Sequence, residues 1–308
     1  MTAVLRLATR ASALARWQAE HVAALLQQAA HNAGSAIRTE LLPLDTTADR
    51  RLEVPISAMG GKGVFVKEIQ QAVLDGRADL AVHSAKDLPG QTPDGLVLAA
   101  VPQRADPRDV LVGSELAALG PGAPVATGSV RRRVQLADLR PDLTFVELRG
   151  NIGTRLEKVP DGGAIVMAAA AIDRLGLWPE ITLRGLVWEV FEPQVLVPQV
   201  GQGALAVEVR DGEDEILELV RAIEHAHSRW TVDAERAFLA ALGGDCDLPA
   251  GAHATVLPDG SGVVLDAMLA SLDGHVVLRH RDQGPEASEL GRAVADHLVN
   301  LASATNGA

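Results

Sequence analysis

Residues 60–90, "GGKGVFVKEIQQAVLDGRADLAVHSAKDLPG", contain the pattern that decides the fold. A glycine-rich turn at 59–63 opens the segment 64–76, which predicts a helix. The apolar run 78–84 then predicts a strand whose last residues enter a polar turn. A helix followed at once by a strand is typical of the repeating unit of a parallel α/β sheet.

The same alternation continues on both sides of this segment. Upstream lie two predicted strands and the helix between them, at 4–9, 37–44 and 12–34. From about residue 106 the pattern restarts, with predicted strands and helices at 109–113, 124–129, 130–139, 143–150 and 162–171. The restart predicts a second lobe. The strand-like segment 193–210, rich in Pro and Gly, predicts a return crossing between the two lobes.

The C-terminal part has a different pattern. Two amphipathic helices are predicted at 213–226 and 231–242, and three short strands with glycine turns follow Cys246. A last helix is predicted from about 285 to 301. The predicted fold class is therefore α/β, with two lobes and a small C-terminal α+β domain.

Composition excludes several classes of function. The 308 residues carry a formal net charge of −12, which argues against nucleic acid or an anionic membrane as the partner. One cysteine excludes an internal disulfide and a Cys-rich zinc site, and the scattered histidines predict no metal centre. The first residues do not resemble a signal peptide, and no apolar run is as long as a membrane span. We expect a soluble, cytoplasmic protein.

Arginine clusters are the first anomaly in this acidic chain. "SVRRR" (129–133), "LRGNIGTR" (148–155) and Arg10 all lie at predicted strand ends or loop starts. Hydroxyl groups and guanidinium groups at a helix N-terminus favour an anion, and arginine is suited to carboxylates. The alternative is a solvated basic face with surface ion pairs. "GGKG" lacks the spacing of a phosphate-binding P-loop, and there is no GxGxxG fingerprint.

The segment "VHSAKDLPG" (82–90) is the second feature. The predicted strand ends here and delivers Ser84, Lys86 and Asp87 into a turn. Ligand sites of open parallel sheets lie outside the carboxyl ends of the strands. Lys86 would hold Asp87 ionised, ready to accept an N–H or to stabilise a cation. The alternative is ordinary turn chemistry before a proline.

Cys246 lies in the loop "GGDCDLPAG" (243–251), between Asp245 and Asp247. Flanking carboxylates raise a thiol pKa, so Cys246 is a poor nucleophile for repeated turnover. A lone cysteine is commonly a small buried apolar residue, but this loop is polar. A thiol that reacts only once, with a strong electrophile, needs no low pKa. The sequence therefore favours an attachment point over a catalytic thiol.

Taken together, these segments resemble the porphobilinogen deaminase (hydroxymethylbilane synthase) family from about residue 4 to residue 255. The motifs that carry the resemblance are "LATRASALARWQAEHV" (7–22), "AVHSAKDLP" (81–89), "ATGSVRRRVQL" (126–136), "LRGNIGTRLEK" (148–158), "VGQGALAVEVR" (200–210) and the cysteine loop. The resemblance implies two lobes like those of periplasmic binding proteins and a third domain. The implied division is 1–102 with 197–215, then 103–196, then 216–308.

The resemblance also implies the chemistry. A dipyrromethane cofactor would be bound to Cys246 through a thioether. Four porphobilinogen molecules would be added to it one at a time, with loss of ammonia, to give hydroxymethylbilane in tetrapyrrole and heme biosynthesis. The family analogy suggests a monomer with porphobilinogen as its small-molecule substrate.

The resemblance assigns roles to individual residues. Asp87 would be catalytic, steadying the cationic intermediates and helping proton transfer to the leaving amine. The cofactor-binding residues would be Cys246, Lys86, Ser84, Thr127, Ser129, Arg131, Arg132 and Arg155. The substrate-binding residues would be Arg10, Ser12, Arg149 and Arg174. Lys62 and Phe65 would belong to a flexible active-site loop.

Two positions depart from the family pattern. Asp245 directly precedes the cysteine where Gly is usual, and Gly128 stands where Ser is common. Asp245 places a negative charge near a cofactor that itself carries carboxylates. Two alternatives to the enzyme stay open: a small-anion binding protein of the same two-lobed fold, and a paralogue inactivated by Asp245.

Overall fold

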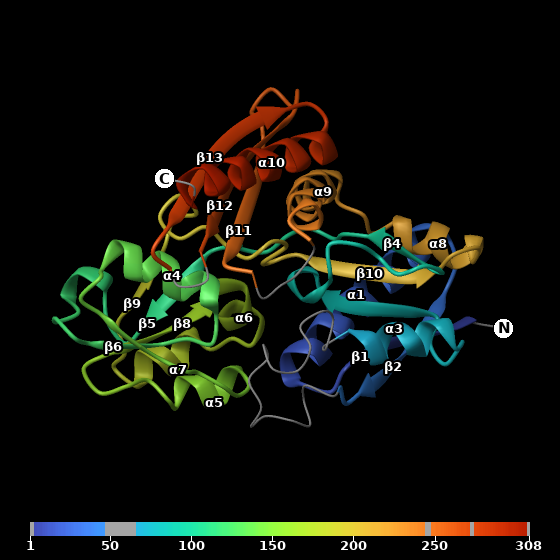
Figure 1. Ribbon diagram of the computed structural model, residues 1–308. Helices are drawn as coiled ribbons and strands as arrows, with labels where there is room; N and C mark the ends of the chain where they lie inside the picture. The colour runs from blue at the N-terminus through green and yellow to red at the C-terminus, as the bar shows by residue number, and fades with distance from the viewer. Residues whose placement is uncertain (1–2, 47–65, 244–247, 272–273, 307–308) are drawn as a thin grey trace.

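The structure is a computed structural model that describes residues 3–46, 66–243, 248–271 and 274–306. These residues form two α/β lobes and a smaller C-terminal domain, which lies above both lobes in Figure 1. Each part has a sheet of its own, so the predicted fold class is confirmed. We call the three parts lobe 1, lobe 2 and the C-terminal domain.

Lobe 1 is built on a five-stranded sheet in the order β2-β1-β3-β10-β4. Its strands are β1 (Ala3–Arg10), β2 (Ile37–Leu44), β3 (Leu80–Ser84), β4 (Leu96–Ala100) and β10 (Leu205–Arg210). Its helices are α1 (Ala13–Asn32), α3 (Lys67–Leu74) and α8 (Asp214–Arg221). Strands β1, β2 and β3 are parallel, but β10 is antiparallel to β3 and β4. The expectation of a parallel sheet is wrong at β10, because the chain re-enters lobe 1 at the end of the sheet where β3 finishes, with Leu205 opposite Ser84.

Helix α1 shows how local sequence sets the ends of an element. Ser12 precedes the helix in an extended conformation, and its Oγ accepts a hydrogen bond from Ala15 N at 3.3 Å. Gly34 follows the helix with a φ of +74°, a conformation that glycine adopts without strain. Between these ends Val22 and Leu26 are fully buried against the lobe 1 sheet. The predicted helix start and stop are confirmed.

Lobe 2 repeats the plan with the sheet order β7-β6-β8-β5-β9. Its strands are β5 (Asp109–Val112), β6 (Pro124–Ala126), β7 (Thr144–Val146), β8 (Ala164–Ala168) and β9 (Trp188–Val190). Its helices are α4 (Val130–Leu139), α5 (Ile152–Leu156), α6 (Ala169–Arg174) and α7 (Trp178–Leu183), with a 3-10 turn, η3 (Leu116–Ala118). Strand β5 is antiparallel to both neighbours, so this sheet is also mixed.

The C-terminal domain packs two helices on an antiparallel sheet. Its strands are β11 (Ala250–Val256), β12 (Val263–Ala270) and β13 (Val277–Gly284), and its helices are α9 (Ala226–Ala241) and α10 (Ala287–Asn306). A Cβ on Gly291 of α10 would lie 2.3 Å from Ala234 O of α9, so only glycine permits this close approach of the helices. Phe238 of α9 is fully buried in the resulting core.

Two segments without helix or strand, 101–108 and 191–204, run between the lobes. They contact each other closely, since a Cβ on Gly203, whose φ is +83°, would lie 2.5 Å from Ala105 O. Of the strand-like region 193–210, only its end forms a strand, β10. The predicted return crossing therefore exists, but most of it is irregular.

Helix α8 follows β10 and packs on lobe 1. Its side chain Val220 is fully buried in the lobe 1 core, so the domain boundary expected at residue 216 falls inside a helix of this lobe. Within the described ranges, no helix combines the length and the apolar character that crossing a membrane requires.

Candidate active site

A polar turn at the end of β3 carries three of the predicted site residues. Strand β3 continues into a short 3-10 helix, η2 (Ala85–Asp87), which places Ser84, Lys86 and Asp87 at the carboxyl end of the strand. Because β1 is parallel to β3, its last residue, Arg10, reaches the same edge of the sheet. Arg10 Nη1 lies 3.9 Å from Asp87 Oδ2, and their side chains are 24% and 28% exposed. This loosely paired carboxylate remains accessible to a ligand.

Lys86 connects this turn to the segment that returns from lobe 2. Its Nζ donates a hydrogen bond to Gln202 Oε1 at 3.4 Å. Burial and the Arg132 guanidinium lower the pKa of Lys86 to about 8, against the attraction of Asp87 and Asp109. At neutral pH the ammonium form still predominates and can bind a carboxylate, and such a ligand would raise the pKa again.

The two predicted serines of lobe 1 have partners within the lobe. Ser84 Oγ lies 2.9 Å from Gln18 Nε2 and 3.1 Å from Gln18 Oε1. Ser12 Oγ accepts the N-cap hydrogen bond at the start of α1, which leaves its O–H as the donor for a ligand. Gln18 was not among the residues predicted from the sequence. The available signal was an amide side chain on the otherwise apolar buried face of α1.

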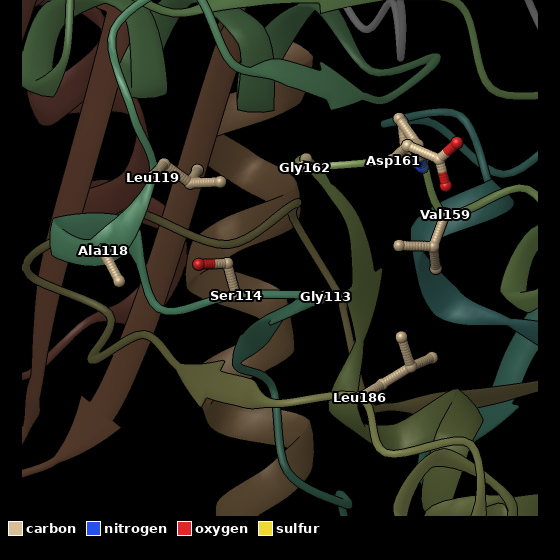
Figure 2. A pocket seen from close by; sticks show the side chains of 10 residues that line it. Gly113, Ser114, Ala118, Leu119, Val159, Asp161, Gly162 and Leu186 are labelled. Atoms are coloured by element: carbon tan, nitrogen blue, oxygen red, sulfur yellow. The ribbon is translucent and has the colours of Figure 1, made fainter.

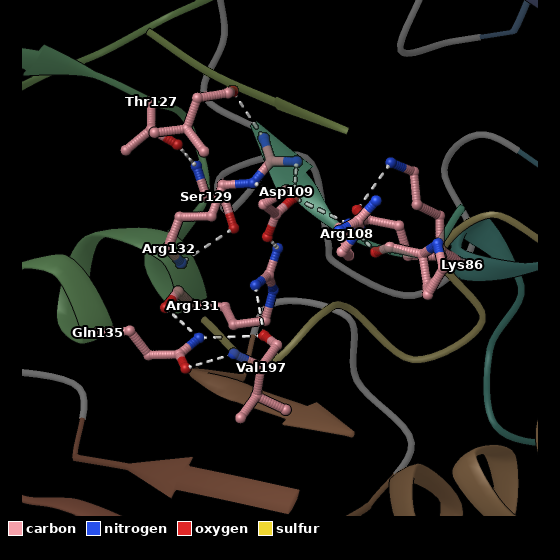
Figure 3. A network of polar contacts seen from close by, with 12 residues as sticks. Lys86, Arg108, Asp109, Thr127, Ser129, Arg131, Arg132, Gln135 and Val197 are labelled. Atoms are coloured by element: carbon pink, nitrogen blue, oxygen red, sulfur yellow. Dashed lines mark hydrogen bonds and ion pairs between the residues drawn. The ribbon is translucent and has the colours of Figure 1, made fainter. Parts of the chain in front are cut away.

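The arginines at the start of α4 converge on one carboxylate (Figure 3). Arg131 Nη2 donates to Asp109 Oδ2 at 2.8 Å, and Arg132 Nη2 donates to Asp109 Oδ1 at 2.7 Å. Arg131 Nη1 also donates to Val197 O, and Arg132 Nη1 donates to Val166 O. Both arginines are buried, as is Asp109. The predicted basic cluster is therefore an internal ion-pair network, not a solvated face.

This network keeps a positive excess close to the β3 turn. Burial would raise the pKa of Asp109, but Arg131 and Arg132 outweigh it and hold the pKa well below its ordinary range. One ionised carboxylate thus faces two guanidinium groups. Gln202 Nε2 also donates to Asp109 Oδ1 at 2.8 Å, while its Oε1 accepts from Lys86. Gln202 thereby links the cation of lobe 1 to the arginine network of lobe 2.

The hydroxyl groups before α4 order its first turn. Ser129 is the N-cap, and its Oγ accepts from Arg132 N at 3.4 Å. Thr127 Oγ1 accepts from Ser129 N at 3.2 Å. A Cβ on Gly128 would lie 3.0 Å from Leu148 O, which is tighter than an ordinary contact. Serine at this position would need its neighbour to shift, so the departure from the family pattern has a local steric reason.

Arg149 precedes the short helix α5, and Arg155 lies in its last turn. Arg155 Nε donates to Gly150 O at 2.9 Å, and Arg149 Nε lies 3.6 Å from Glu147 Oε1. Asn151 starts the helix by accepting from its backbone, which fixes the turn between the two arginines.

Electrostatics show that these arginines gather. Burial lowers the pKa of Arg155, and the guanidinium groups of Arg132, Arg149 and Arg10 lower it further, while Asp87 raises it. Repulsion of this kind requires that residues from both lobes face a common region. The structure therefore brings together predicted residues from four separate sequence segments around Asp87.

Arg174 makes a different set of contacts. Its Nη2 donates to Gly203 O at 2.7 Å, and its guanidinium carbon lies 5.8 Å from the Trp17 ring centroid in α1. It bridges α6 of lobe 2 to lobe 1. Burial lowers the pKa of Arg174, and Asp173 opposes this. Its described contacts are therefore those of a link between the lobes.

Three predicted site residues, Cys246, Lys62 and Phe65, lie outside the described residues.

The two sides of the cysteine loop contact both halves of the site. Before the loop, a Cβ on Gly90 would lie 2.8 Å from Ala240 Cα, so α9 presses on the turn that follows Asp87. After the loop, a Cβ on Gly251 would lie 3.1 Å from Arg131 Cδ. The described chain before residue 244 thus lies beside the Asp87 turn, and the described chain after residue 247 lies beside the arginine network.

A pocket of about 410 Å³ lies elsewhere, at the far end of the lobe 2 sheet (Figure 2). It is bordered by Gly113, where β5 has ended, whereas Asp109 begins that strand. Asp161 is its one ionisable side chain, and no predicted site residue lines it. The pocket therefore does not belong to the cationic site.

The fold and the site define a class: a two-lobed α/β protein with a cationic site to which both lobes contribute residues. Comparison with family models narrows this class. Residues 5–218 match the model described as "Porphobilinogen deaminase, dipyromethane cofactor binding domain", and residues 230–300 match "Porphobilinogen deaminase, C-terminal domain". The chain belongs to the porphobilinogen deaminase family.

Two relatives named porphobilinogen deaminase agree with this assignment. The chain is 44% identical over 306 residues to porphobilinogen deaminase of Nitratidesulfovibrio vulgaris, which covers 96% of this chain and 93% of the relative. It is 46% identical over 302 residues to that of Roseiflexus castenholzii, covering 96% of each. Among solved structures, a TRAP periplasmic solute binding protein from Chromohalobacter salexigens aligns at 16% identity and a TM-score of 0.42, covering 80% of each chain.

These matches confirm the predicted family, the transferase class and the dipyrromethane cofactor. The structure also offers a suitable donor set, because carboxylates are the substituents that guanidinium and ammonium groups bind best. The roles of individual residues stay predictions.

Proposed function

We propose that this chain condenses four porphobilinogen molecules, with loss of ammonia, into hydroxymethylbilane on a dipyrromethane primer tethered to Cys246. One observation carries the proposal: Arg10 of lobe 1 lies 3.9 Å from Asp87, and Gln202 links Lys86 of the same turn to the arginine network of lobe 2. A small-anion binding protein would explain the arginines but not Asp87 and Cys246 together.

The cations divide between the tethered primer and the incoming substrate. We assign Lys86, Arg132 and Arg155 to carboxylates of the primer, since Arg132 is buried and burial is the largest influence on the pKa values of Lys86 and Arg155. Arg10 and Arg149, which are more open, would receive the acetate and propionate of each porphobilinogen. The remaining cofactor ligands would be Ser84, Thr127, Ser129 and Arg131, and the remaining substrate ligands would be Ser12 and Arg174. Lys62 and Phe65 would border the site from the preceding loop.

Asp87 is the proposed catalytic residue. When bound, dipyrromethane supplies the pyrrole carbon to which each substrate unit is added. Asp87 accepts N–H hydrogen bonds and offsets the positive charge that develops on the substrate as ammonia leaves. Its carboxylate also moves a proton at the leaving nitrogen. Arg10 Nη1 lies 3.9 Å from Asp87 Oδ2, close enough to interact with the carboxylate without enclosing it.

Intact-mass spectrometry tests the tether directly. We expect protein from a host that supplies porphobilinogen to exceed its chain mass by two linked pyrrole units, and Cys246→Ala to show the chain mass alone. Because Cys246 is the only cysteine, the loaded protein should also show no free thiol in a titration under denaturing conditions.

The alternatives predict different results. A folded wild-type protein with a free thiol and no added mass would point to the binding protein or the inactive paralogue. Binding of porphobilinogen without turnover would then support the binding protein.

We also propose that the enzyme is a cytoplasmic monomer, as the family resemblance suggests. Sedimentation should show one species near the chain mass of 32.3 kDa. A concentration-independent dimer would contradict this.

A further inference from the structure

Gln202, in the segment that returns from lobe 2, is a buried amide whose nitrogen and oxygen both have partners. The residue is only 1% exposed. Its Nε2 donates to Pro107 O at 2.7 Å and to Asp109 Oδ1 at 2.8 Å, which uses both amide hydrogens. A flipped amide would turn its oxygen toward these two acceptors. Oε1 is therefore fixed on the other side, where it accepts a hydrogen bond from Lys86 Nζ at 3.4 Å.

The backbone of Gln202 is also held in place. Its carbonyl oxygen accepts from Arg104 Nε at 2.9 Å. Gly201, directly before it, has a φ of +70°, and a Cβ there would lie 3.1 Å from Lys86 N. The returning segment thus packs against the short helix η2, which ends at Asp87. The amide projects from a turn that is fixed against lobe 1.

These contacts place Gln202 between two cations that the proposed function assigns to the primer. Arg132 Nη2 donates to the same Asp109 oxygen, Oδ1, at 2.7 Å. Lys86 and Arg132 are therefore connected through one amide and one carboxylate (Figure 3). The two cations repel each other, which lowers the pKa of Lys86, so the groups between them set how closely they approach.

We propose that Gln202 is a positioning residue that sets the spacing between Lys86 of lobe 1 and Arg132 of lobe 2. The inference rests on the proposed function, since both cations there bind carboxylates of one tethered primer. A change in their spacing would displace the free end of that primer from Asp87. A displacement of about 1 Å between reacting groups can cost about a hundredfold in rate.

Gln202→Met tests this, because methionine is close to glutamine in size and lacks the amide. Intact mass gives the fraction of molecules that carry the primer, and kcat is expressed per loaded molecule. We expect kcat to fall about tenfold or more and KM to change less than about twofold.

Gln135→Met is the matched control. Gln135 has no exposed surface, its Nε2 donates to Arg131 O and Val197 O, and its Oε1 accepts from Val197 N at 2.8 Å. It supports the same arginine network, but its described hydrogen bonds go to α4 and to Val197 and not to the η2 turn. The control should lose comparable stability and keep its kcat within about twofold.

A second readout concerns Lys86 itself and does not respond to a general loss of stability. Oε1 of Gln202 favours the ammonium form of Lys86. In cofactor-free Cys246→Ala, adding Gln202→Met should therefore lower the pKa of Lys86 by about half a unit to one unit. Reductive methylation of Lys86, followed against pH by peptide mass spectrometry, measures this shift, and Gln135→Met should not produce it. The charged groups that act on Lys86 are the same in both variants, namely Arg132, Arg155, Asp87 and Asp109.

Either readout can overturn the proposal. A kcat for Gln202→Met equal to that of Gln135→Met, or an unmoved titration of Lys86, would leave Gln202 a purely structural residue. If Gln202→Met does not fold, Gln202→Asn replaces it, because an amide one methylene shorter cannot keep its contacts to both Asp109 and Lys86. The same two readouts then decide, with smaller changes expected. Wild-type protein that neither carries the added mass nor turns over would instead refute the proposed function.

Discussion

Asp109 and Asp87 are both aspartates surrounded by cations, yet their settings are opposite. Asp109 has no exposed surface and binds Arg131 and Arg132 at 2.7–2.8 Å. Asp87 is 28% exposed, and its nearest described arginine nitrogen, on Arg10, lies 3.9 Å away. The carboxylate of Asp109 accepts hydrogen bonds from protein groups on both oxygens and stabilises the site. That of Asp87 is held loosely and is available to a substrate.

Asp109→Asn should have the largest effect if this contrast is correct. It leaves two buried guanidinium groups without their counter-charge, and breaking a buried ion pair in this way costs about 3–5 kcal/mol. We expect the free energy of unfolding in urea to fall by that amount. Cofactor loading should fall with it.

The control for Asp109 is Asp142→Asn. Asp142 pairs with Arg140 at 2.7 Å on the surface of lobe 2, where ion pairs contribute little. If both variants lost the same small amount of stability, the arginine network would not be the structural element we describe.

Asp87→Asn should show the reverse pattern. We expect kcat to fall about a hundredfold or more, because the amide cannot move the proton or offset the developing charge. The melting temperature and the added mass should remain close to those of the wild type, since Asp87 has only loose contacts.

Asp94→Asn is the matched control, an exposed carboxylate seven residues further along the same segment. Normal turnover by Asp87→Asn, with Asp94→Asn also normal, would remove Asp87 from the mechanism.

The sequence predicted the turn that bears Asp87 better than the buried network around Asp109. Local patterns were sufficient for β3 and its turn, since an apolar run ending in polar residues is read directly from the chain. The start of the helix predicted from residue 12 is also read from the local sequence, because serine is a favoured N-cap residue. The sequence also identified the arginines at the start of α4. It did not show whether their side chains face solvent or a buried partner.

Long-range partners were the part that local patterns could not supply. Asp109 lies 22 residues before Arg131, and Gln202 reaches it from 93 residues away. The usable signal was a carboxylate directly before the apolar run "VLV" (110–112), where a charge is costly unless it is paired. The direction of β10 was likewise missed, because strand direction depends on where the chain returns from lobe 2 and not on the composition of the strand.

Lys86 lies next to Asp87 and is linked to Asp109 through Gln202. The pH dependence that Lys86 adds to stability is the smallest of the expected effects. In cofactor-free protein, burial and Arg132 lower its pKa from 10.5 to about 8, so between these pH values the unfolded chain binds more protons than the folded one. Lys86 therefore adds stability as pH rises, by about 1 kcal/mol between pH 8 and 9. We expect Cys246→Ala to gain this amount relative to the double variant Cys246→Ala/Lys86→Met. The loaded wild type should gain less, because bound carboxylates raise the pKa of Lys86. An equal gain in loaded and cofactor-free protein would mean that Lys86 does not contact the primer. Lys86 would then belong to the buried network around Asp109 and not to the open site around Asp87.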